Sequence, residues 1–247
     1  MSSLLAYRAG FYSHLMGSMV WGVFHYISIY LLTFRIQSVY GWSKPELFLL
    51  TASFGVMWGL FRLLFIKTFH DFAGVILGGR LDGILIKPVD SQFLMSVWRV
   101  AYDESLRVIL GIGFTIYTIH AYQLPISLVS VLLYIFLMMF AILASYSIWF
   151  ISSTITFWSP RLDNMIGLLF SLAGLMRYPS NVMQRFGETF VLFITPLIFV
   201  ITPATRALIG KATLPEMIWL VGCACLLFLV SRKFWHYALR SYTSMNN

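Results

Sequence analysis

Long apolar runs, separated by short polar turns, divide the chain into segments long enough to cross a membrane. A helix needs about 20 predominantly apolar residues to cross the roughly 30 Å hydrocarbon core of a bilayer. The pattern therefore predicts an all-α, polytopic membrane protein with six transmembrane helices. The expected spans cover residues 16–34, 47–66, 100–119, 126–150, a fifth segment that starts near residue 163, and 217–230.

The second expected span carries two local signals. Ser43, followed by Pro45 and Glu46, is typical of an N-cap residue with a proline and an acid in the first helical turn. Gly55 and Gly59 are four residues apart, a spacing that permits close packing against another helix. This second motif is too common in membrane helices to indicate which helix is the partner.

Two apolar segments outside the spans are expected to lie in the membrane interface. Residues 2–15 hold a single charge, Arg8, among aromatic side chains, which is typical of an interfacial helix. Residues 69–77 are too short to span and would lead the chain from the second span to the segment that follows.

Residues 162–210 alternate between short apolar stretches and polar breaks. We expect the fifth span to start near Asp163 and to break near Pro179, with re-entrant helices before the sixth span. Interrupted helices at membrane depth require protein or a water-filled cavity to satisfy their backbone. The alternative interpretation leaves Arg177 and Arg185 cytoplasmic and makes residues 190–209 the fifth span.

Composition agrees with a membrane protein. Of 247 residues, 60% are hydrophobic and 11% are charged, against about 25% charged in soluble domains. No stretch is long and polar enough to form a separate soluble domain, so residues 1–247 are expected to form one transmembrane domain.

The formal charge of +8 indicates the orientation of the chain rather than a nucleic-acid partner, because loops on the cytoplasmic side are enriched in Lys and Arg. The basic residues of the expected cytoplasmic segments are Arg8, Arg62, Lys67, Arg80, Lys87, Arg99, Arg107, Arg161, Arg232, Lys233 and Arg240, against Arg35, Lys44 and Lys211 in the expected outer turns. Both termini are therefore expected to be cytoplasmic.

Several catalytic and metal-binding motifs are absent from the sequence. It contains no G-x-x-x-x-G-K-[ST] phosphate loop, no H-E-x-x-H or C-x-x-C metal motif and no G-x-S-x-G nucleophile motif. Cys223 and Cys225 are two apart in an apolar run, so they face different sides of a helix and do not indicate a disulfide. These observations exclude an enzyme of those classes and leave transport or assembly.

Residues 78–90 are the stretch that apolar composition does not explain. The glycine pair Gly78-Gly79 is predicted to end the preceding helix, because glycine tolerates a sharp reversal of the backbone. Pro88 ends whatever helix follows the glycines. The space between them fits one helix of about two turns.

The side chains of this short helix suggest that something outside the bilayer holds it. Leu81, Ile84 and Leu85 are spaced to form one apolar stripe. Asp82 in the first turn and Lys87 in the last would complement the helix dipole. The alternative interpretation is an ordinary cytoplasmic loop that rests on the membrane surface.

A charged cluster marks the expected start of the third span. Arg99 and Asp103 are four residues apart, as are Asp103 and Arg107. Glu104 and Arg107 are three apart, so all these charges can pair along one helix. We interpret the cluster as a salt-bridged helix entry at the cytoplasmic mouth, with an ion or substrate site in the membrane as the alternative.

Short motifs spread over nearly the whole chain are shared with a known family. They are Gly41-Trp42-Ser43 with Glu46, the run from Gly79 to Pro88, Phe157-Trp158, Arg177-Tyr178-Pro179, Thr195-Pro196 and Thr202-Pro203-Ala204. The most specific is Gly-x-Leu-Asp-x-x-Leu-x-Lys-Pro, which starts at Gly79. On these residues the chain resembles the ABC-2 type exporter permeases, in particular the small six-span bacterial permease components.

The resemblance implies that residues 78–90 form a coupling helix, which docks into a groove on a separate ABC ATPase subunit. The residues implied in ATPase coupling are Gly79, Arg80, Leu81, Asp82, Gly83, Ile84, Leu85, Lys87 and Pro88. The resemblance also implies an exporter of two permeases, identical or homologous, and two ATPases in the bacterial plasma (inner) membrane. ATP and Mg would bind to the ATPase, and this chain would hold no cofactor or metal.

The expected cargo follows from the resemblance and from charge. Residues 108–160 contain no Asp, Glu, Lys or Arg, which favours an apolar or amphipathic molecule such as a lipid, a lipid-linked molecule, a peptide or a drug. An ion-gradient-driven secondary transporter is the alternative, although it should carry midplane acids and inverted repeats, and the sequence shows neither. A non-transporting membrane scaffold is a third class.

Overall fold

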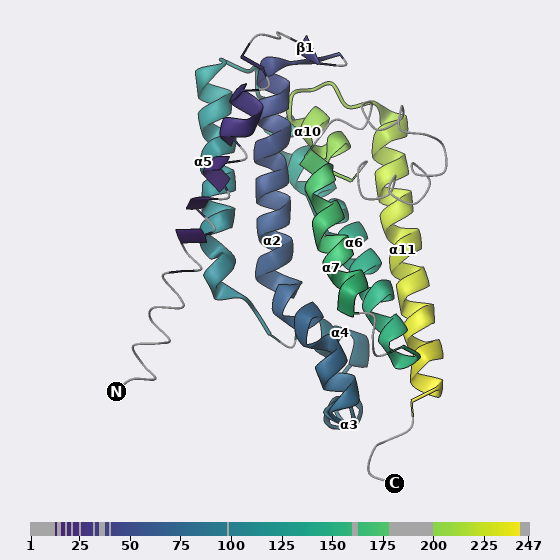
Figure 1. The fold of residues 1–247 in the computed structure, drawn as a ribbon. Coiled ribbons are helices and arrows are strands. Elements are labelled where there is room, and N and C mark those ends of the chain that lie inside the picture. Colours follow the sequence, from purple (N-terminus) through teal and green to yellow (C-terminus); the bar gives the residue numbers. More distant parts are fainter. Residues whose placement is uncertain are drawn as a thin grey trace.

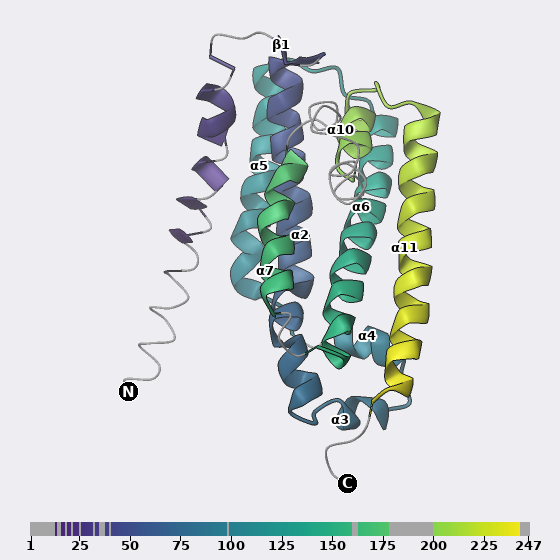
Figure 2. The same cartoon turned by 45° about the vertical axis from the view of Figure 1, so that its right-hand side comes forward.

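The chain folds into long helices that run side by side between the two ends of the molecule, as the computed structural model shows (Figures 1 and 2). The structure describes residues 13, 16, 17, 19, 20, 22–24, 26–31, 33, 34, 38, 39, 41–97, 99–159, 163–177 and 200–242. The described elements are β1 (Ser38–Val39), β2 (Trp42–Ser43), α2 (Lys44–Leu77), α3 (Asp82–Leu85), α4 (Ser91–Ser96), a 3-10 turn (Tyr102–Glu104), α5 (Ser105–Ala121), α6 (Leu128–Thr154), a 3-10 turn (Ile155–Phe157), α7 (Asp163–Ala173), a 3-10 turn (Gly174–Arg177), α10 (Thr202–Leu208) and α11 (Leu214–Arg240).

Within the described residues, three helices are long and apolar enough to cross a bilayer. They are α2, α6 together with its following turn, and α11. The described part of the first expected span forms a shorter apolar helix, Gly22–Leu31. The all-α prediction is confirmed apart from the two-residue antiparallel pairing of β1 with β2, and the count of six spans stays a prediction.

The start of α2 is where the sequence predicts it. The Ser43 backbone N–H donates to Glu46 Oε2 at 2.8 Å, and the two residues form a capping box with Pro45 in the first turn. Such a box satisfies two backbone donors that the helix leaves unpaired at its N-terminus.

The end of α2 corrects the prediction for residues 69–77. They are not a separate interfacial segment, because α2 continues unbroken to Leu77. Phe69, Phe72 and Val75 are buried, so tertiary packing supports the helix there. At 1.5 Å per residue, the 34 residues of α2 reach about 51 Å, well beyond the roughly 30 Å hydrocarbon core.

Small residues set a close contact between α2 and α5. A Cβ built at Gly55 would lie 3.5 Å from the Cα of Gly111, and one at Gly59 would lie 3.0 Å from the backbone N of Val108. From the other side, a Cβ at Gly111 would lie only 2.6 Å from the backbone N of Val56. The partner of the Gly55 and Gly59 motif is therefore α5, which the sequence does not indicate.

The helix Gly22–Leu31 packs against both α5 and α2, and the ring of Tyr26 lies 5.7 Å from that of Phe48. The rings of Tyr26 and Phe114 stack with centroids 3.8 Å apart, and the hydroxyls of Tyr26 and Thr118 form a hydrogen bond of 3.1 Å. Figure 2 shows this segment beside α5 at the edge of the helix layer.

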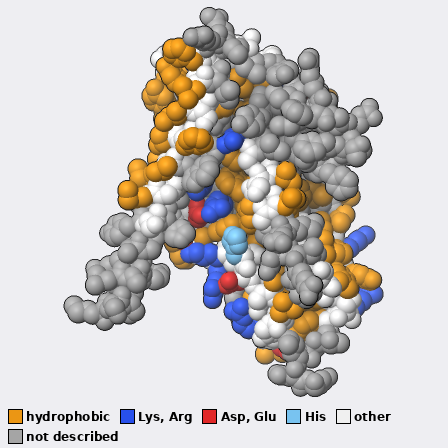
Figure 3. Space-filling view, in the orientation of Figure 1, with side chains coloured by type: hydrophobic (Ala, Val, Ile, Leu, Met, Phe, Trp, Pro, Cys, Tyr) orange, Lys and Arg blue, Asp and Glu red, His pale blue; other side chains and the backbone are white. Residues whose placement is uncertain are grey.

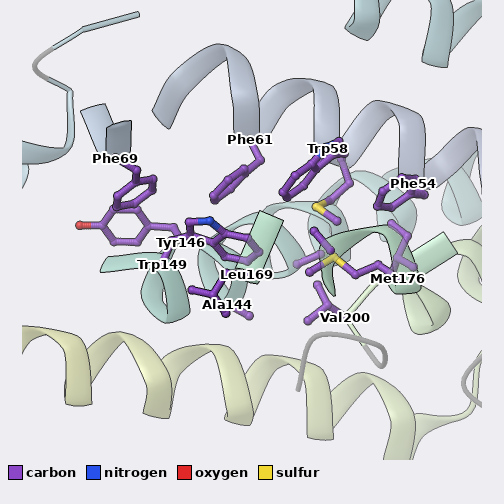
Figure 4. Packing of buried hydrophobic residues seen from close by; sticks show 14 of the residues in the cluster. Phe54, Trp58, Phe61, Phe69, Ala144, Tyr146, Trp149, Leu169, Met176 and Val200 are labelled. Carbon is purple, nitrogen blue, oxygen red and sulfur yellow. The ribbon is translucent and has the colours of Figure 1, made fainter. Parts of the chain in front are cut away.

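An aromatic core joins α2 to α6 (Figure 4). The ring of Trp149 lies 5.6 Å from Trp58 and 5.0 Å from Phe61, measured between centroids. Such aromatic pairs add about 0.5–1.5 kcal/mol each beyond the burial of their area. Farther along, Trp235 of α11 meets Phe150 edge-on at 5.3 Å, so the core extends to the last helix.

The remaining helix boundaries differ from the prediction in ways that local signals explain. α5 begins at Ser105 rather than near residue 100, because the chain is irregular at 99–101 and forms a 3-10 turn at Tyr102–Glu104. α6 covers the fourth expected span. α11 covers the sixth and runs on to Arg240, since nothing in the basic stretch after residue 230 breaks a helix.

The region between residues 162 and 210 is only partly described. α7 begins at Asp163, as predicted, and a 3-10 turn carries it to Arg177. Of the alternative fifth span at 190–209, only residues 200–209 are described, and there the chain turns at residues 200 and 201 before α10 begins. The expected break near Pro179 and most of the expected re-entrant segment lie outside the described residues, as does the interfacial segment 2–15 apart from Ser13.

Ion pairs join neighbouring elements at the end of the molecule that carries β1 and β2. Lys211 pairs with Glu46 at 2.5 Å, and Arg206 pairs with Glu216. The guanidinium of Arg206 also lies over the Trp42 ring, 5.3 Å from its centroid. The end of α11 and the short helix α3 lie at the opposite end (Figure 1).

The contact between α2 and α5 predicts that alanine substitutions at two glycines of α5 have opposite effects on stability. Gly111→Ala places a methyl group against backbone atoms, which should cost about 1–3 kcal/mol of stability. Gly113→Ala meets nothing within 4 Å, and should be neutral or stabilising because alanine favours a helix by about 1 kcal/mol over glycine. Thermal unfolding of both variants in one detergent measures the difference, and equal melting temperatures would contradict the contact.

Candidate functional site

The candidate site is the elbow, residues 78–97, which joins α2 to the segment before α5 and contains α3 and α4 (Figures 1 and 2). The glycine pair ends α2 as predicted: the Gly78 N–H donates to the Gly74 carbonyl at 3.2 Å. Gly79 has φ of +67°, a left-handed conformation in which glycine carries no steric penalty. This position requires a glycine for the chain to reverse.

The apolar stripe predicted for this segment is divided between the inside and the outside of the chain. α3 has four residues rather than two turns, because the residue before a proline disfavours helical geometry and Pro88 follows closely. Leu81 and Ile84 are fully buried in the core of this chain, whereas Leu85 is 39% exposed. The prediction that all three face one partner is wrong.

A second apolar group is exposed instead. Ile86 is 83% exposed and Val89 is 50% exposed, and both lie next to exposed Lys87 and Pro88. Arg80 and Gly83 are also exposed, and Asp82 is half-buried. Adjacent exposed apolar side chains make this end of the chain a candidate interaction surface. We call Leu85, Ile86 and Val89 the elbow tip.

Asp90 fixes the start of α4. Its carboxylate accepts from the Phe93 N–H at 2.8 Å, which is an N-cap hydrogen bond. Arg232 of α11 pairs with the same carboxylate at 2.5 Å. The hydrogen bond from Arg232, and then that from the Phe93 amide, lower the pKa of Asp90 below its usual value, so the ion pair is charged at neutral pH.

A buried polar network holds α4 against α6 and α11. Gln92 Nε2 donates to the Tyr146 hydroxyl at 3.1 Å and to Ser231 Oγ at 3.2 Å. The hydroxyls of Ser96 and Tyr146 are 2.6 Å apart. Gln92 and Ser96 are buried, so the network lies in a low-dielectric environment where each lost partner is costly.

A further contact attaches α11 to the elbow. The Trp235 Nε1–H donates to Ser91 Oγ at 3.0 Å, and the Trp235 ring is fully buried. Beyond the end of the helix, burial and then the neighbouring Asp82 carboxylate raise the pKa of the Tyr242 phenol. The elbow is thus connected to α11 at Ser91 and Gln92 as well as through the Asp90 ion pair.

In the charged cluster after the elbow, two ion pairs form with α2, which the sequence did not predict. Arg99 pairs with Asp71 of α2 at 2.6 Å, and Asp103 pairs with Lys67 of α2. The spacing argument fails at Arg99 because residues 99–101 are not helical. Figure 3 shows charged side chains gathered along the middle of this face, between hydrophobic areas.

Glu104 lies at the centre of the cluster. It pairs with Arg107 at 3.0 Å, as predicted, and also with Arg62 of α2. The Glu104 side chain is 6% exposed. The interpretation as a salt-bridged start of the third span fits this arrangement. In addition, the ion pair with Arg62 joins this helix start to α2.

Several residues of the site were not singled out from the sequence. They are Asp90, Ser91, Gln92, Ser96, Tyr146, Ser231, Arg232 and Trp235. Asp90, two residues after Pro88 and directly before Ser91, carries an N-cap signal. The others have no local signal, because their partners lie far away in the chain. Among the described residues, no three His, Cys, Asp or Glu side chains are grouped to hold a metal ion.

The fold and the site define a helical integral membrane protein with exposed apolar side chains at one end. Comparison with protein families matches residues 19–246 to the family described as ABC-2 family transporter protein, and the chain belongs to this family. No curated protein and no solved structure matches the chain. The chain is therefore an ABC transporter permease component, which is a membrane transport component and not itself catalytic.

The two kinds of ion pair predict different costs when they are broken. Glu104→Gln leaves Arg62 and Arg107 close together without a carboxylate, which should cost about 3–5 kcal/mol. Asp71→Asn removes the partner of Arg99 at a half-exposed position, which should cost about 0–1 kcal/mol. Denaturant titrations of both variants in the same detergent compare them, and an equal or smaller loss for Glu104→Gln would contradict the central role of Glu104.

Proposed function

We propose that the chain is the permease subunit of an ATP-driven ABC exporter and that the elbow tip docks an ABC ATPase. Membership of the ABC-2 family implies an ATPase partner in general. The observation that carries the proposal is the exposure of Leu85, Ile86 and Val89 at the tip, while Leu81 and Ile84 anchor the same segment inside the chain. This division gives the tip a rigid support and leaves apolar side chains for a partner.

The basic residues near the tip would lie at the polar edge of the proposed interface. Lys87 lies between Ile86 and Val89 in the chain, Arg80 comes before Leu81, and both are exposed. Interfaces commonly surround an apolar centre with polar residues that contribute less to affinity. An acidic margin on the ATPase groove would complement these two cations and would favour fast association.

The contacts of the elbow provide a route for motion. ATP-driven closure of the ATPases would move the tip, and the polar network at Gln92 and Ser96 connects the tip to α6 and α11. A packed two-state element is the physical basis for such transmission. The expected result is a rocking of the helices that opens a cleft between two permeases, identical or homologous.

The cargo we propose is apolar or amphipathic, because residues 108–160 carry no Asp, Glu, Lys or Arg. Lipids, lipid-linked molecules, peptides and drugs belong to this class. ATP and Mg would be bound by the partner ATPase. The bacterial plasma (inner) membrane, with both termini cytoplasmic, remains the proposed location, supported by the distribution of basic residues.

Truncation at the tip separates a docking surface from a passive loop. In the proposed interface, Ile86→Ala should weaken co-purification of the ABC ATPase, because a buried aliphatic anchor contributes about 2 kcal/mol or more. That loss corresponds to roughly 25-fold weaker binding. Lys87→Ala removes a rim charge and should change binding little. Quantitative mass spectrometry of the ATPase retained by each tagged variant is the measurement.

Leu81→Ala is the control for folding in this experiment. Leu81 is buried within the chain, so its truncation should lower the melting temperature of the chain, at a cost of about 2–5 kcal/mol. Ile86→Ala should leave the melting temperature unchanged. Wild-type ATPase retention and transport in Ile86→Ala would overturn the docking role of the tip.

A further inference from the structure

A cavity of about 310 Å³ lies between α4, α6 and α11, beside the elbow. Clefts of about 300–1,000 Å³ are typical of sites for small molecules, so this cavity fits part of a lipid rather than a whole one. Phe93, Val97 and Met139 line it and are exposed, so it opens to the outside of the chain.

The cavity has one polar end and one apolar end. Asp90 and Arg232, which form an ion pair, lie at the polar end. Phe228 lies one turn of α11 before Arg232, and Ile142 and Leu143 lie one turn of α6 before Tyr146. Both helices run toward the elbow, so the apolar end of the cavity points to the middle of the membrane.

The depth of the polar end matches the level of lipid headgroups. Arg232 lies 18 residues after Leu214, the first residue of α11, which is about 27 Å along the helix. That length nearly equals the roughly 30 Å thickness of the hydrocarbon core. With Leu214 placed at the far boundary of the hydrocarbon, Arg232 lies where α11 leaves it, and the apolar end lies within it.

A second, basic pocket of about 300 Å³, open and formed on the surface of α11 alone, adjoins the cavity. It is lined by Arg232, Lys233, His236, Tyr237 and Arg240, so Arg232 belongs to both pockets. Asp90 neutralises Arg232. Within the part of the chain that the structure describes, no acid forms an ion pair with Lys233 or Arg240. This pocket therefore has a net positive charge beside an apolar cavity.

We propose that the two pockets form one site for an anionic phospholipid. One acyl chain lies in the cavity against Ile142, Leu143 and Phe228, and the phosphate lies against Lys233 and Arg240. Basic residues at the membrane-surface end of a transmembrane helix attract anionic lipid headgroups in this way. The inference rests on the membrane placement of α11 and does not depend on an ATPase partner or on the cargo.

The site also touches the elbow. Gln92 and Ser96 line the cavity and belong to the network that fixes α4. A bound acyl chain excludes water from this network, which strengthens its hydrogen bonds. Lipid occupancy therefore stabilises the position of α4.

Native mass spectrometry of the full chain tests the site. The chain is equilibrated in detergent with equal amounts of phosphatidylglycerol and phosphatidylcholine, and the lipid that remains bound is counted. The wild-type chain should retain the anionic lipid with a preference of roughly tenfold or more, since each basic residue near a lipid surface contributes measurably to binding. Lys233→Gln combined with Arg240→Gln, two changes at exposed positions, should abolish the preference.

Cavity variants test the position of the acyl chain. Leu143→Trp fills the cavity and should lower retention of phosphatidylglycerol at least as strongly as the double charge variant. Leu132→Trp, on an exposed part of α6 outside the cavity, is the matched control and should retain lipid normally. Equal retention of the two lipids by the wild-type chain, or normal retention by Leu143→Trp, would overturn the proposal. Displacement of the lipid by soluble glycerol phosphate would overturn it as well, because the site would then bind only the phosphate.

Discussion

The buried polar network at the elbow is the constraint on which the rest of the account depends. α4 has six residues, too few to be stable as an isolated helix, and Gln92 and Ser96 hold it through hydrogen bonds to Tyr146 and Ser231. A buried polar group that loses its partner incurs its full desolvation cost. The elbow therefore cannot move away from α6 and α11 without breaking these bonds, and a displacement of the elbow is carried to both helices.

The two helices that flank the elbow in the chain, α2 and α5, are fastened to each other. Glu104 joins Arg62 of α2 to Arg107 of α5, and the close approach at Gly111 continues the same seam. We expect α2 and α5 to move as one unit, because their backbones approach closely at Gly111. The ion pairs of Glu104 with Arg62 and Arg107 join the same two helices near the elbow. The elbow lies between this unit and the pair formed by α6 and α11, which is where a force applied from outside would act on both.

The sequence predicts features that depend on neighbouring residues and fails where distant ones decide. The cap at Ser43 and the reversal at Gly79 follow from local chemistry, and both are confirmed. Whether Leu81 is buried or exposed depends on which distant residues pack over it. Periodicity alone therefore predicted wrongly that Leu81 faces a partner outside the chain. The partner of Arg99 lies on α2 rather than one turn along, and the partners of Gln92 lie 54 and 139 residues away. No local pattern encodes such distances.

The central claim is that the elbow tip contacts an ATPase while the base of the same segment is buried in the permease. A photo-crosslinking amino acid placed at Ile86, in cells that make the assembled complex, tests it most directly. We expect a crosslink from position 86 to an ABC ATPase, and crosslinks from position 81 only within this chain. Crosslinks from position 86 to lipid alone, with the ATPase present in the same complex, would contradict the account.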